Sequence, residues 1–309
     1  MICVNNLTKV FGDSTVVDDL SFEVNAGEVV GFLGPNGAGK STTMKMLMGF
    51  LSITSGSVQI NGKDILDAPL SIRKDIGYLP EGAPAYTEMT VYQFLTFIAQ
   101  ARGIPSKQRK QAILDVAEKV ALKNVLNKTI DTLSKGFKRR VGIAQAMIHD
   151  PKILILDEPT DGLDPNQKHQ VRKLIKDLAE DKIVIISTHI LEEVSALCNR
   201  VMIIAEGEMR FDGTPQELLL KSKHHNAVSM QMRGLADISG LLELEGVADL
   251  HYDRQNSQIT LFADAGTSIV EPVSAFIYEN QLPVESFYQV KGSFDDVFRE
   301  VTQSREGTI

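Results

Sequence analysis

The sequence predicts a layered α/β domain with an inserted helical subdomain, followed by a small α+β domain. The first observation is a pair of continuous apolar runs, at residues 153–157 and 183–187, which flank a helical segment and form a β-α-β unit of a parallel sheet. The second is a glycine-rich loop that follows another apolar run, ending at Leu33. The third is a change of pattern and charge beyond residue 221, where short strands and helices alternate.

Length and composition are those of a two-domain globular protein. The chain has 309 residues, of which 43% are hydrophobic and 23% charged, and this composition excludes fibrous, collagen-like and disordered proteins. The formal net charge is −8, and residues 222–309 contain 6 basic and 13 acidic side chains. We therefore expect two domains, at residues 1–221 and 222–309. Because an acidic surface repels a phosphate backbone, no nucleic-acid partner is expected.

Runs rich in β-branched residues predict four early strands in the first domain, at residues 4–9, 21–24, 28–33 and 57–60. The segment from about 90 to 150 is mostly helical by pattern and is interpreted as the inserted subdomain. Thr90 and Gln93 form a capping box at its start. A later helix is predicted from Pro165 to about Glu180, with Asp164 as its N-cap.

A helix capped by Thr214 is expected to end near Lys221, and a polar linker at 222–226 precedes the second domain. The pattern there predicts a strand, a helix, two strands, a helix, a strand and a last helix, at residues 227–232, 236–244, 247–252, 258–262, 268–280, 284–290 and 295–301. The first six elements have the order βαββαβ, the ferredoxin-like split arrangement. No convergent catalytic set is found in them, so dimerisation, ligand regulation and partner docking stay open as roles.

Hydrophobic patterning predicts no direct membrane attachment. No apolar run approaches the roughly 18–20 residues that a membrane-spanning helix needs. The first nine residues lack the basic segment and apolar core of a signal peptide. We therefore expect a cytoplasmic protein, whose role at a membrane would pass through a partner.

The strongest motif is a phosphate-binding loop at residues 34–41, where GPNGAGKS matches G-x-x-x-x-G-K-[ST]. An apolar strand precedes the loop and a helical segment follows it, as the motif requires. Glycines let the loop turn tightly with its N–H groups facing an anion, and the following helix adds positive potential at its N-terminus. We expect Lys40 to reach the β- and γ-phosphates and Ser41 to hold Mg²⁺.

Two acidic residues follow an apolar strand later in the chain. Ile153–Asp157 has the Walker B pattern of P-loop NTPases, and Asp157 is expected to contact Mg²⁺. Glu158 comes next, at the carboxyl edge of the sheet where ligands bind in such folds. This position allows Glu158 to orient or deprotonate a water molecule that attacks the γ-phosphate.

A third motif, at residues 133–137, precedes Asp157 by about twenty residues and begins a helix. At this point the sequence resembles the ATP-binding cassette (ABC) proteins, whose signature in this place reads Leu-Ser-Gly-Gly-Gln. Leu133, Ser134 and Gly136 match that signature, whereas Lys135 and Phe137 depart from it. Lys135 either strengthens ATP capture or is a solvated charge at the helix start.

Four further positions match landmarks of this family. Phe11 lies where the family stacks an aromatic ring on adenine, with a core phenylalanine as the alternative. Glu81 occupies the place where most members have glutamine. Residues 160–164 match the D-loop, and His189 matches the switch histidine. The resemblance covers about residues 2–220.

The resemblance implies a P-loop NTPase cassette that hydrolyses ATP with Mg²⁺ at the interface of two head-to-tail cassettes. It also implies a separate integral-membrane permease, which would place the chain at the inner face of the plasma membrane. Glu158 and His189 are the implied catalytic residues, and the implied Mg²⁺ ligands are Ser41, Glu81 and Asp157. The implied ATP contacts are Phe11, Gly34, Pro35, Asn36, Gly37, Ala38, Gly39, Lys40, Ser41, Thr42, Glu81, Ser134, Gly136, Asp157 and Asp164.

Within the family, three features resemble the nucleotide-binding subunit of an ABC-2-type exporter, of the gliding-motility, drug-efflux or cation-efflux kind. They are Glu81, Lys135 and an added tail that ends with residues 293–298. Residues 82–89, which include Pro84 and Tyr86, are the candidate permease-docking segment. The basic run at 138–140 is interpreted as a solvated helix face.

Other classes of ATP-binding protein share part of this pattern. A DNA-maintenance cassette ATPase carries long heptad-bearing insertions, and a translation-type ATPase needs two phosphate loops; this sequence has neither feature. A small-molecule kinase does not need residues 133–136 or His189. ATPase activity without a phosphate acceptor distinguishes an ABC protein from a kinase.

Overall fold

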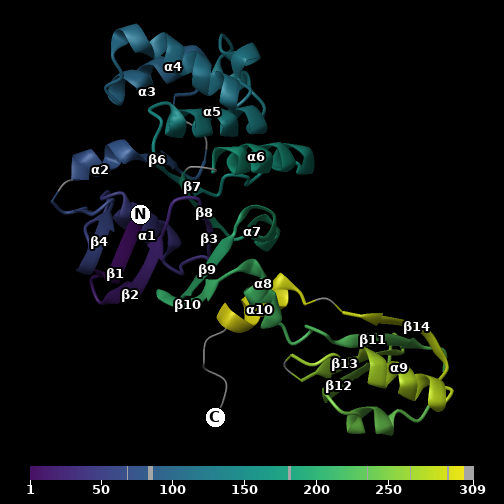
Figure 1. The fold of residues 1–309 in the computed structure, drawn as a ribbon. Helices are drawn as coiled ribbons and strands as arrows, with labels where there is room; N and C mark the ends of the chain where they lie inside the picture. Colours follow the sequence, from purple (N-terminus) through teal and green to yellow (C-terminus); the bar gives the residue numbers. More distant parts are fainter. Residues whose placement is uncertain are drawn as a thin grey trace. The chain divides into compact units, whose positions relative to one another are not determined.

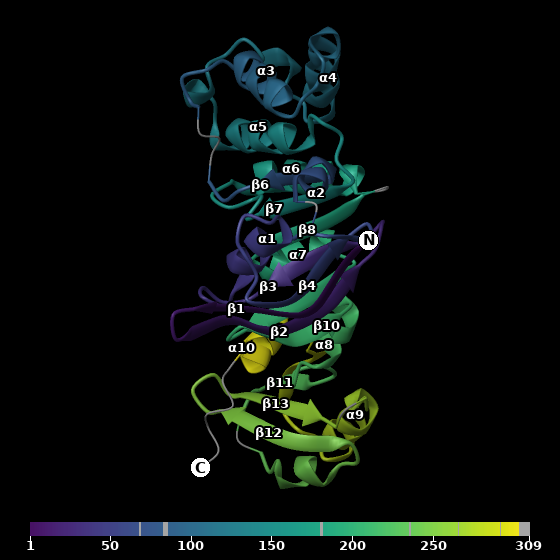
Figure 2. The same ribbon diagram turned by 90° about the vertical axis from the view of Figure 1, so that its left-hand side faces the viewer.

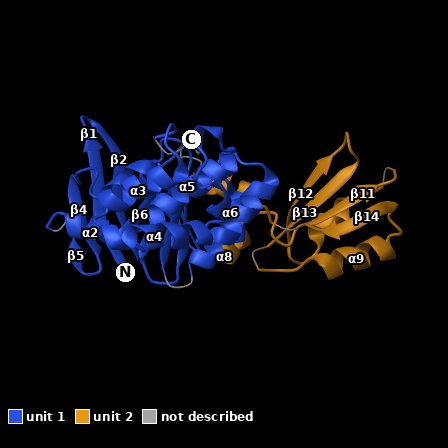
Figure 3. Cartoon of the chain, turned by 90° about the horizontal axis from the view of Figure 1, so that it is seen from above, with its two compact units in different colours: residues 1–213 blue, residues 214–309 orange. Residues whose placement is uncertain are grey.

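The computed structural model describes residues 1–67, 69–82, 86–179, 182–234, 236–264, 266–290 and 292–302. The chain divides into two compact units, Met1–Gly213 and Thr214–Ile309 (Figure 3). The division falls before helix α8 (Pro215–Leu220), whereas the sequence pattern places it after this helix. Helix α8 belongs to the second unit because it packs against α10 (Phe294–Thr302).

The first unit is built on a six-stranded sheet with strand order β10-β9-β3-β8-β7-β6. Five of its strands are parallel, and β10 pairs antiparallel with β9. The predicted buried strands are confirmed as β7 and β8. The strands are β3 (Val29–Leu33), β6 (Ile76–Leu79), β7 (Ile153–Asp157), β8 (Ile183–Thr188), β9 (Arg200–Ala205) and β10 (Glu208–Gly213).

A second, antiparallel sheet in this unit has strand order β2-β1-β4-β5. Its strands are β1 (Ile2–Phe11), β2 (Ser14–Val24), β4 (Ser55–Ile60) and β5 (Lys63–Asp64), of which the first two are longer than the pattern predicts. Helix α1 (Lys40–Leu47) contributes Met44, Met46 and Leu47 to one core cluster with side chains from both sheets. The helix that follows the phosphate loop is therefore fixed by burial.

The inserted helices lie between the neighbouring strands β6 and β7 in sequence. They are α3 (Val91–Ala101), α4 (Ser106–Lys119) and α5 (Lys135–Met147), with 3-10 turns at Lys123–Val125 and Ile130–Thr132, and α2 (Pro69–Asp75) precedes β6. Figures 1 and 2 show α3, α4 and α5 gathered beyond β6. The Thr90 capping box is present, since Gln93 N donates to Thr90 Oγ1 at 3.2 Å and Thr90 N donates to Gln93 Oε1 at 2.9 Å.

Helices α5, α6 (Pro165–Leu178) and α7 (Leu191–Leu197) stand against the six-stranded sheet. Helix α5 packs on β6, α7 packs on β3, and α6 packs against both helices. Asp164 is the N-cap of α6, as predicted, and accepts a hydrogen bond from Gln167 N at 2.9 Å. The six-stranded sheet is thus covered on the face opposite to α1 as well.

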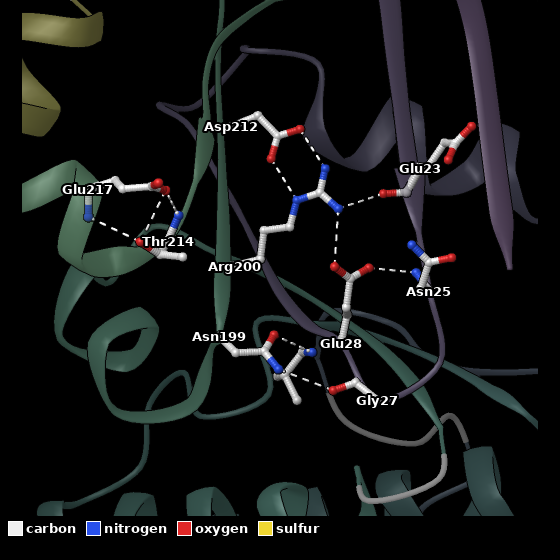
Figure 4. A network of polar contacts seen from close by, with 10 residues as sticks. Glu23, Asn25, Gly27, Glu28, Asn199, Arg200, Asp212, Thr214 and Glu217 are labelled. Carbon is white, nitrogen blue, oxygen red and sulfur yellow. Dashed lines mark hydrogen bonds and ion pairs between the residues drawn. The ribbon is translucent and has the colours of Figure 1, made fainter.

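Arg200 at the start of β9 joins the ends of three other strands (Figure 4). Its Nε and Nη2 atoms donate to the two carboxylate oxygens of Asp212, each over 2.7 Å. Its Nη1 atom donates to the Glu23 carbonyl at 2.8 Å and to Glu28 Oε1 at 3.3 Å. Because Asn199 also accepts from Val29 N at 2.9 Å, this network fixes the strand that leads into the phosphate loop.

The second unit contains an antiparallel sheet with strand order β12-β13-β11-β14. Its elements are β11 (Val228–Met232), β12 (Val247–Asp253), β13 (Gln258–Ala263), α9 (Val270–Glu279) and β14 (Val284–Gln289), followed by α10. The predicted helix at 236–244 is wrong in type, because only a 3-10 turn forms, at Ser239–Glu243. Leu241 is the buried side chain of that turn, so a single apolar residue joins the core where the sequence pattern predicts a helix with an apolar face.

Candidate functional site

The candidate site lies at the carboxyl ends of three adjacent parallel strands. Strand β8 is between β3 and β7, with Leu33 paired to Thr188 and Asp157 paired to Ser187. The segments that follow these strands therefore leave the sheet at one edge. They are the phosphate loop after β3, Glu158 after β7 and His189 after β8, which is the edge where α/β sheets bind ligands.

Two glycines of the phosphate loop are required by close backbone contacts. A Cβ atom on Gly34 would lie 2.3 Å from the Ile204 carbonyl oxygen, and one on Gly39 would lie 2.7 Å from the Val16 carbonyl oxygen. Gly39 also has a φ of 100°, which L-residues rarely adopt. It directly precedes α1, whose first N–H groups have no partner inside the helix, so the loop presents unsatisfied donors.

Lys40 is folded into the phosphate loop. Its side chain is buried, and its Nζ atom donates to the carbonyls of Gly34 at 2.6 Å and Pro35 at 3.0 Å. Burial lowers the pKa of Lys40, and the charges of Glu158, Asp157 and Glu81 oppose that change. These three carboxylates act on one amine, so the predicted basic and acidic residues converge in the fold.

The remaining predicted loop residues differ in exposure. Pro35, Asn36, Gly37 and Ser41 are exposed, Thr42 is half-buried, and Ala38 is buried. The exposed residues are accessible to a ligand, whereas Ala38 is part of the hydrophobic core.

Asp157 and Glu158 occupy different environments at the end of β7. Asp157 is buried, and burial raises its pKa, with the charges of Lys40 and Arg139 acting in the opposite direction. Glu158 has a φ of 47°, an uncommon value for a non-glycine residue, and its N–H donates to the Ser187 carbonyl at 2.8 Å. Burial raises the pKa of Glu158 as well, and its hydrogen bond with His189 opposes this change.

His189 and Thr188 hold the Glu158 carboxylate from the neighbouring strand. His189 Nδ1 lies 2.8 Å from Glu158 Oε1, and because a carboxylate only accepts, the ring N–H donates. The hydroxyl of buried Thr188 donates to Glu158 Oε2 at 3.3 Å. His189 is itself exposed, so its other ring nitrogen is accessible to a ligand. The two predicted catalytic residues are therefore in direct contact.

The interpretation of residues 138–140 as a solvated face is wrong for Arg139. This side chain is buried, and it donates to the carbonyls of Pro159 at 2.9 Å, Asp157 at 3.3 Å, Gly82 at 2.8 Å and Pro80 at 3.4 Å. It joins the loop around Glu81 to the segment around Glu158. A basic tripeptide carries no signal for this role, because the acceptors are backbone atoms of other segments.

The signature residues begin a separate part of the surface. Ser134 is the N-cap of α5 and accepts from Phe137 N at 3.4 Å, while Gly136 is buried against Gln167 of α6. Lys135 is exposed. In the described residues, no hydrogen bond or ion pair joins Ser134 or Gly136 to the phosphate loop of the same chain.

Three other predicted residues are placed as follows. Phe11 is 47% exposed with Lys9 Nζ 4.8 Å from its ring centroid, so the alternative of a core phenylalanine is wrong. Glu81 is exposed, follows β6, and its charge acts on both Lys40 and Asp157. Asp164 is exposed and caps α6. Pro84 of the predicted docking segment lies outside the described residues.

Tyr86 in that segment is 43% exposed and precedes α3. Its ring centroid is 5.3 Å from that of Phe97, which is 42% exposed, and 6.2 Å from that of buried Phe94. Tyr86 and Phe97 therefore form an exposed aromatic pair anchored on α3.

The family described as ABC transporter matches residues 17–161. An uncharacterized ABC transporter ATP-binding protein of Bacillus subtilis, YxlF, is 34% identical over 98% of this chain and 100% of its own length. The Nod factor export ATP-binding protein I of Burkholderia lata is 37% identical over 69% of this chain and 71% of its own length. Among solved structures, cbiO1 of Clostridium perfringens, part of the ABC transporter complex cbiONQ, aligns with a TM-score of 0.64 and 30% identity over 71% of this chain and 90% of that one.

Across the residues that the structure describes, no helix combines the length and the apolar character needed to cross a membrane.

Proposed function

The chain belongs to the family of ABC transporter ATP-binding proteins, and on this premise we propose that it is the ATP-hydrolysing subunit that energises export through a separate membrane permease. The observation that carries the proposal is the arrangement at the sheet edge. Lys40 in the phosphate loop is within the electrostatic influence of Asp157 and Glu158, and His189 holds Glu158. A likeness to an export protein supports the direction of transport.

In the proposed site, the phosphate loop binds the triphosphate. The loop's N–H groups and the start of α1 attract the phosphate oxygens, and Lys40 exchanges its carbonyl partners for the β- and γ-phosphates. Exposed Phe11 stacks on the adenine ring. Pro35, Asn36, Gly37 and Ser41 supply the accessible surface of the loop.

Hydrolysis is assigned to Glu158 and His189. Glu158 orients a water molecule and takes its proton as the water oxygen attacks the γ-phosphorus. The bond between that phosphorus and the bridging oxygen of ADP breaks, which gives ADP and inorganic phosphate. The raised pKa of Glu158 makes it a stronger base than an exposed glutamate. His189 keeps the carboxylate oriented and offers its exposed face to the γ-phosphate.

The donor atoms at this edge fit Mg²⁺. Mg²⁺ prefers oxygen ligands and usually combines one or two carboxylates with phosphate and water oxygens. The hydroxyl of Ser41 and the carboxylate of Asp157 are such donors, and Glu81 adds a second carboxylate near Asp157. Among the described residues, no group of three or more His, Cys, Asp or Glu side chains is placed to hold a metal ion. Bound Mg²⁺ would neutralise phosphate charge.

ABC cassettes work as dimers with a membrane permease, and we propose the same for this chain. Ser134, at the N-terminus of α5, would contact the γ-phosphate bound by the second cassette. Ser134 is exposed, and its hydroxyl caps α5 by accepting from Phe137 N. Asp164 would approach the same interface. ATP then joins the cassettes, and its hydrolysis lets them separate.

The exposed pair of Tyr86 and Phe97 is the proposed permease-docking surface. Docking there would hold the protein at the cytoplasmic face of the membrane. Photo-crosslinking from position 86 in membranes that contain the permease should capture the permease, and crosslinking from Tyr278, which is 85% exposed in the second unit, is the matched control. Equal capture from both positions would remove the assignment.

The central test measures ATP hydrolysis by the purified chain without a phosphate acceptor. We expect the Lys40→Ala variant to lose nucleotide binding, and the Glu158→Gln variant to bind ATP, hydrolyse it at least ~100-fold more slowly and form an ATP-dependent dimer. Activity that requires an acceptor would favour a kinase. A Lys40→Ala variant that binds Mg-ATP as well as the parent chain would overturn the proposed site.

A further inference from the structure

Glu193 is a buried carboxylate close to Glu158 and His189, and the proposed hydrolysis step does not use it. Glu193 on α7 is 1% exposed. An ionised carboxylate at such a position is costly unless polar partners surround it. Two of its partners, Thr160 and Arg172, come from segments distant in sequence, and the third, Thr188, lies five residues before it on β8. The segments of Thr160 and Thr188 both border Glu158.

The first partner is Thr160, which begins the D-loop segment at residues 160–164. Thr160 is fully buried, and its hydroxyl donates a hydrogen bond to Glu193 Oε1. The D-loop continues into α6, and Arg172 on that helix places its Nη2 atom 3.8 Å from the same oxygen. One carboxylate oxygen therefore holds the start of the D-loop and also contacts the helix that follows it.

The second carboxylate oxygen reaches toward the hydrolytic residues through Thr188. The Thr188 hydroxyl lies 3.4 Å from Glu193 Oε2 and 3.3 Å from Glu158 Oε2. It also accepts from Ile190 N at 3.1 Å. A hydroxyl has one proton, so Thr188 donates to one of the two carboxylates at a time. Glu193 thus competes with Glu158 for the Thr188 proton.

We propose that Glu193 is a positioning residue, which couples the D-loop to Glu158 by holding Thr160 with one oxygen and Thr188 with the other. The inference rests on the proposed function, in which Glu158 activates water. Displacement of Thr160 changes how Glu193 is held, and Glu193 in turn changes whether Thr188 supports Glu158. The path runs through three buried side chains, none of which is among the proposed ATP contacts.

The test uses isosteric variants in steady-state ATPase assays. Thr160→Val removes the hydrogen bond and keeps the side-chain shape, whereas Thr160→Ser keeps the hydroxyl. We expect kcat to fall about tenfold or more in Thr160→Val, with the KM for ATP within about twofold of the parent value, and Thr160→Ser to recover most of kcat. Glu193→Gln has one acceptor oxygen in place of two, so it cannot accept from Thr160 and Thr188 together, and the loss of this positioning should lower kcat as well. Glu192→Gln, at an exposed position on the same helix, is the matched control and should leave both constants unchanged.

The double variant Thr160→Val/Glu193→Gln distinguishes coupling from separate structural damage. Residues that act as one unit should lose no more kcat together than the more damaging single change. Fully additive losses, or parent-like kcat in Thr160→Val, would overturn the proposal. Thermal unfolding of each variant shows whether it folds. If Glu193→Gln does not fold, the comparison of Thr160→Val with Thr160→Ser still tests the proposal. A parent chain without ATPase activity would instead refute the proposed function.

Discussion

Replacing the buried Arg139 by methionine should destabilise the first unit. The Arg139 guanidinium makes two short hydrogen bonds, to Pro159 O at 2.9 Å and Gly82 O at 2.8 Å, and two longer ones of 3.3 and 3.4 Å. Methionine fills much of the same volume, so the main loss is polar. A hydrogen bond to a charged group contributes ~1.5–3 kcal/mol, and carbonyls left without a donor add a desolvation penalty.

If only the two short bonds count, the free energy of unfolding should fall by about 3 kcal/mol or more. That is a large part of the 5–15 kcal/mol typical of a domain. Burial already lowers the pKa of Arg139, so part of the gain from these bonds offsets the cost of desolvating the guanidinium, and the estimate stays at the lower end of the sum.

Urea unfolding of the full chain, followed by far-UV circular dichroism, measures this change in the transition of the first unit. Lys138→Met, at a half-buried position one residue earlier on α5, is the matched control and should change the free energy of unfolding by less than about 0.5 kcal/mol. A loss below about 1 kcal/mol for Arg139→Met would refute the reasoning, because it would mean that water replaces the guanidinium without cost.

Two further outcomes follow from the geometry. Burial, with the charge of Arg102, lowers the pKa of His149 from 6.5 to about 4. The folded state therefore prefers the neutral ring. The contribution of His149 to the free energy of unfolding is complete above pH 6.5 and is lost as the pH falls toward 4. Between pH 7.5 and pH 5, the free energy of unfolding measured by thermal unfolding should fall by about 1–2 kcal/mol, and by less in His149→Gln. An equal fall in both proteins would contradict the lowered pKa of His149. Phe11→Ala should raise the KM for ATP several-fold, whereas Phe11→Tyr should preserve it, because phenylalanine and tyrosine rings both stack. If Phe11→Ala has the same KM as the parent chain, this ring does not stack on adenine.

Local features of the sequence were enough to predict much of the cassette. The β-α-β unit and the phosphate loop depend on apolar runs, caps and glycines that act on their own neighbours, and the structure contains each of them. The contact between Glu158 and His189 was also predictable in outline, because parallel strands bring their carboxyl ends to one edge. The second unit was predicted less well, since residues 236–244 suit a helix by pattern but only a 3-10 turn forms there.

The sequence by itself was enough to predict the loop that we propose to bind phosphate and the acidic residues near it, because these features reside in contiguous residues whose backbone conformation is set locally. Only the tertiary structure decided which charged side chains are buried and which residues they contact. Arg139 is buried although its neighbours look solvated, and Glu193 joins Thr160 to Thr188 although nothing in its own helix suggests it. A charge can be buried only where distant segments supply enough hydrogen-bond partners, and which segments those are is a property of the packed fold.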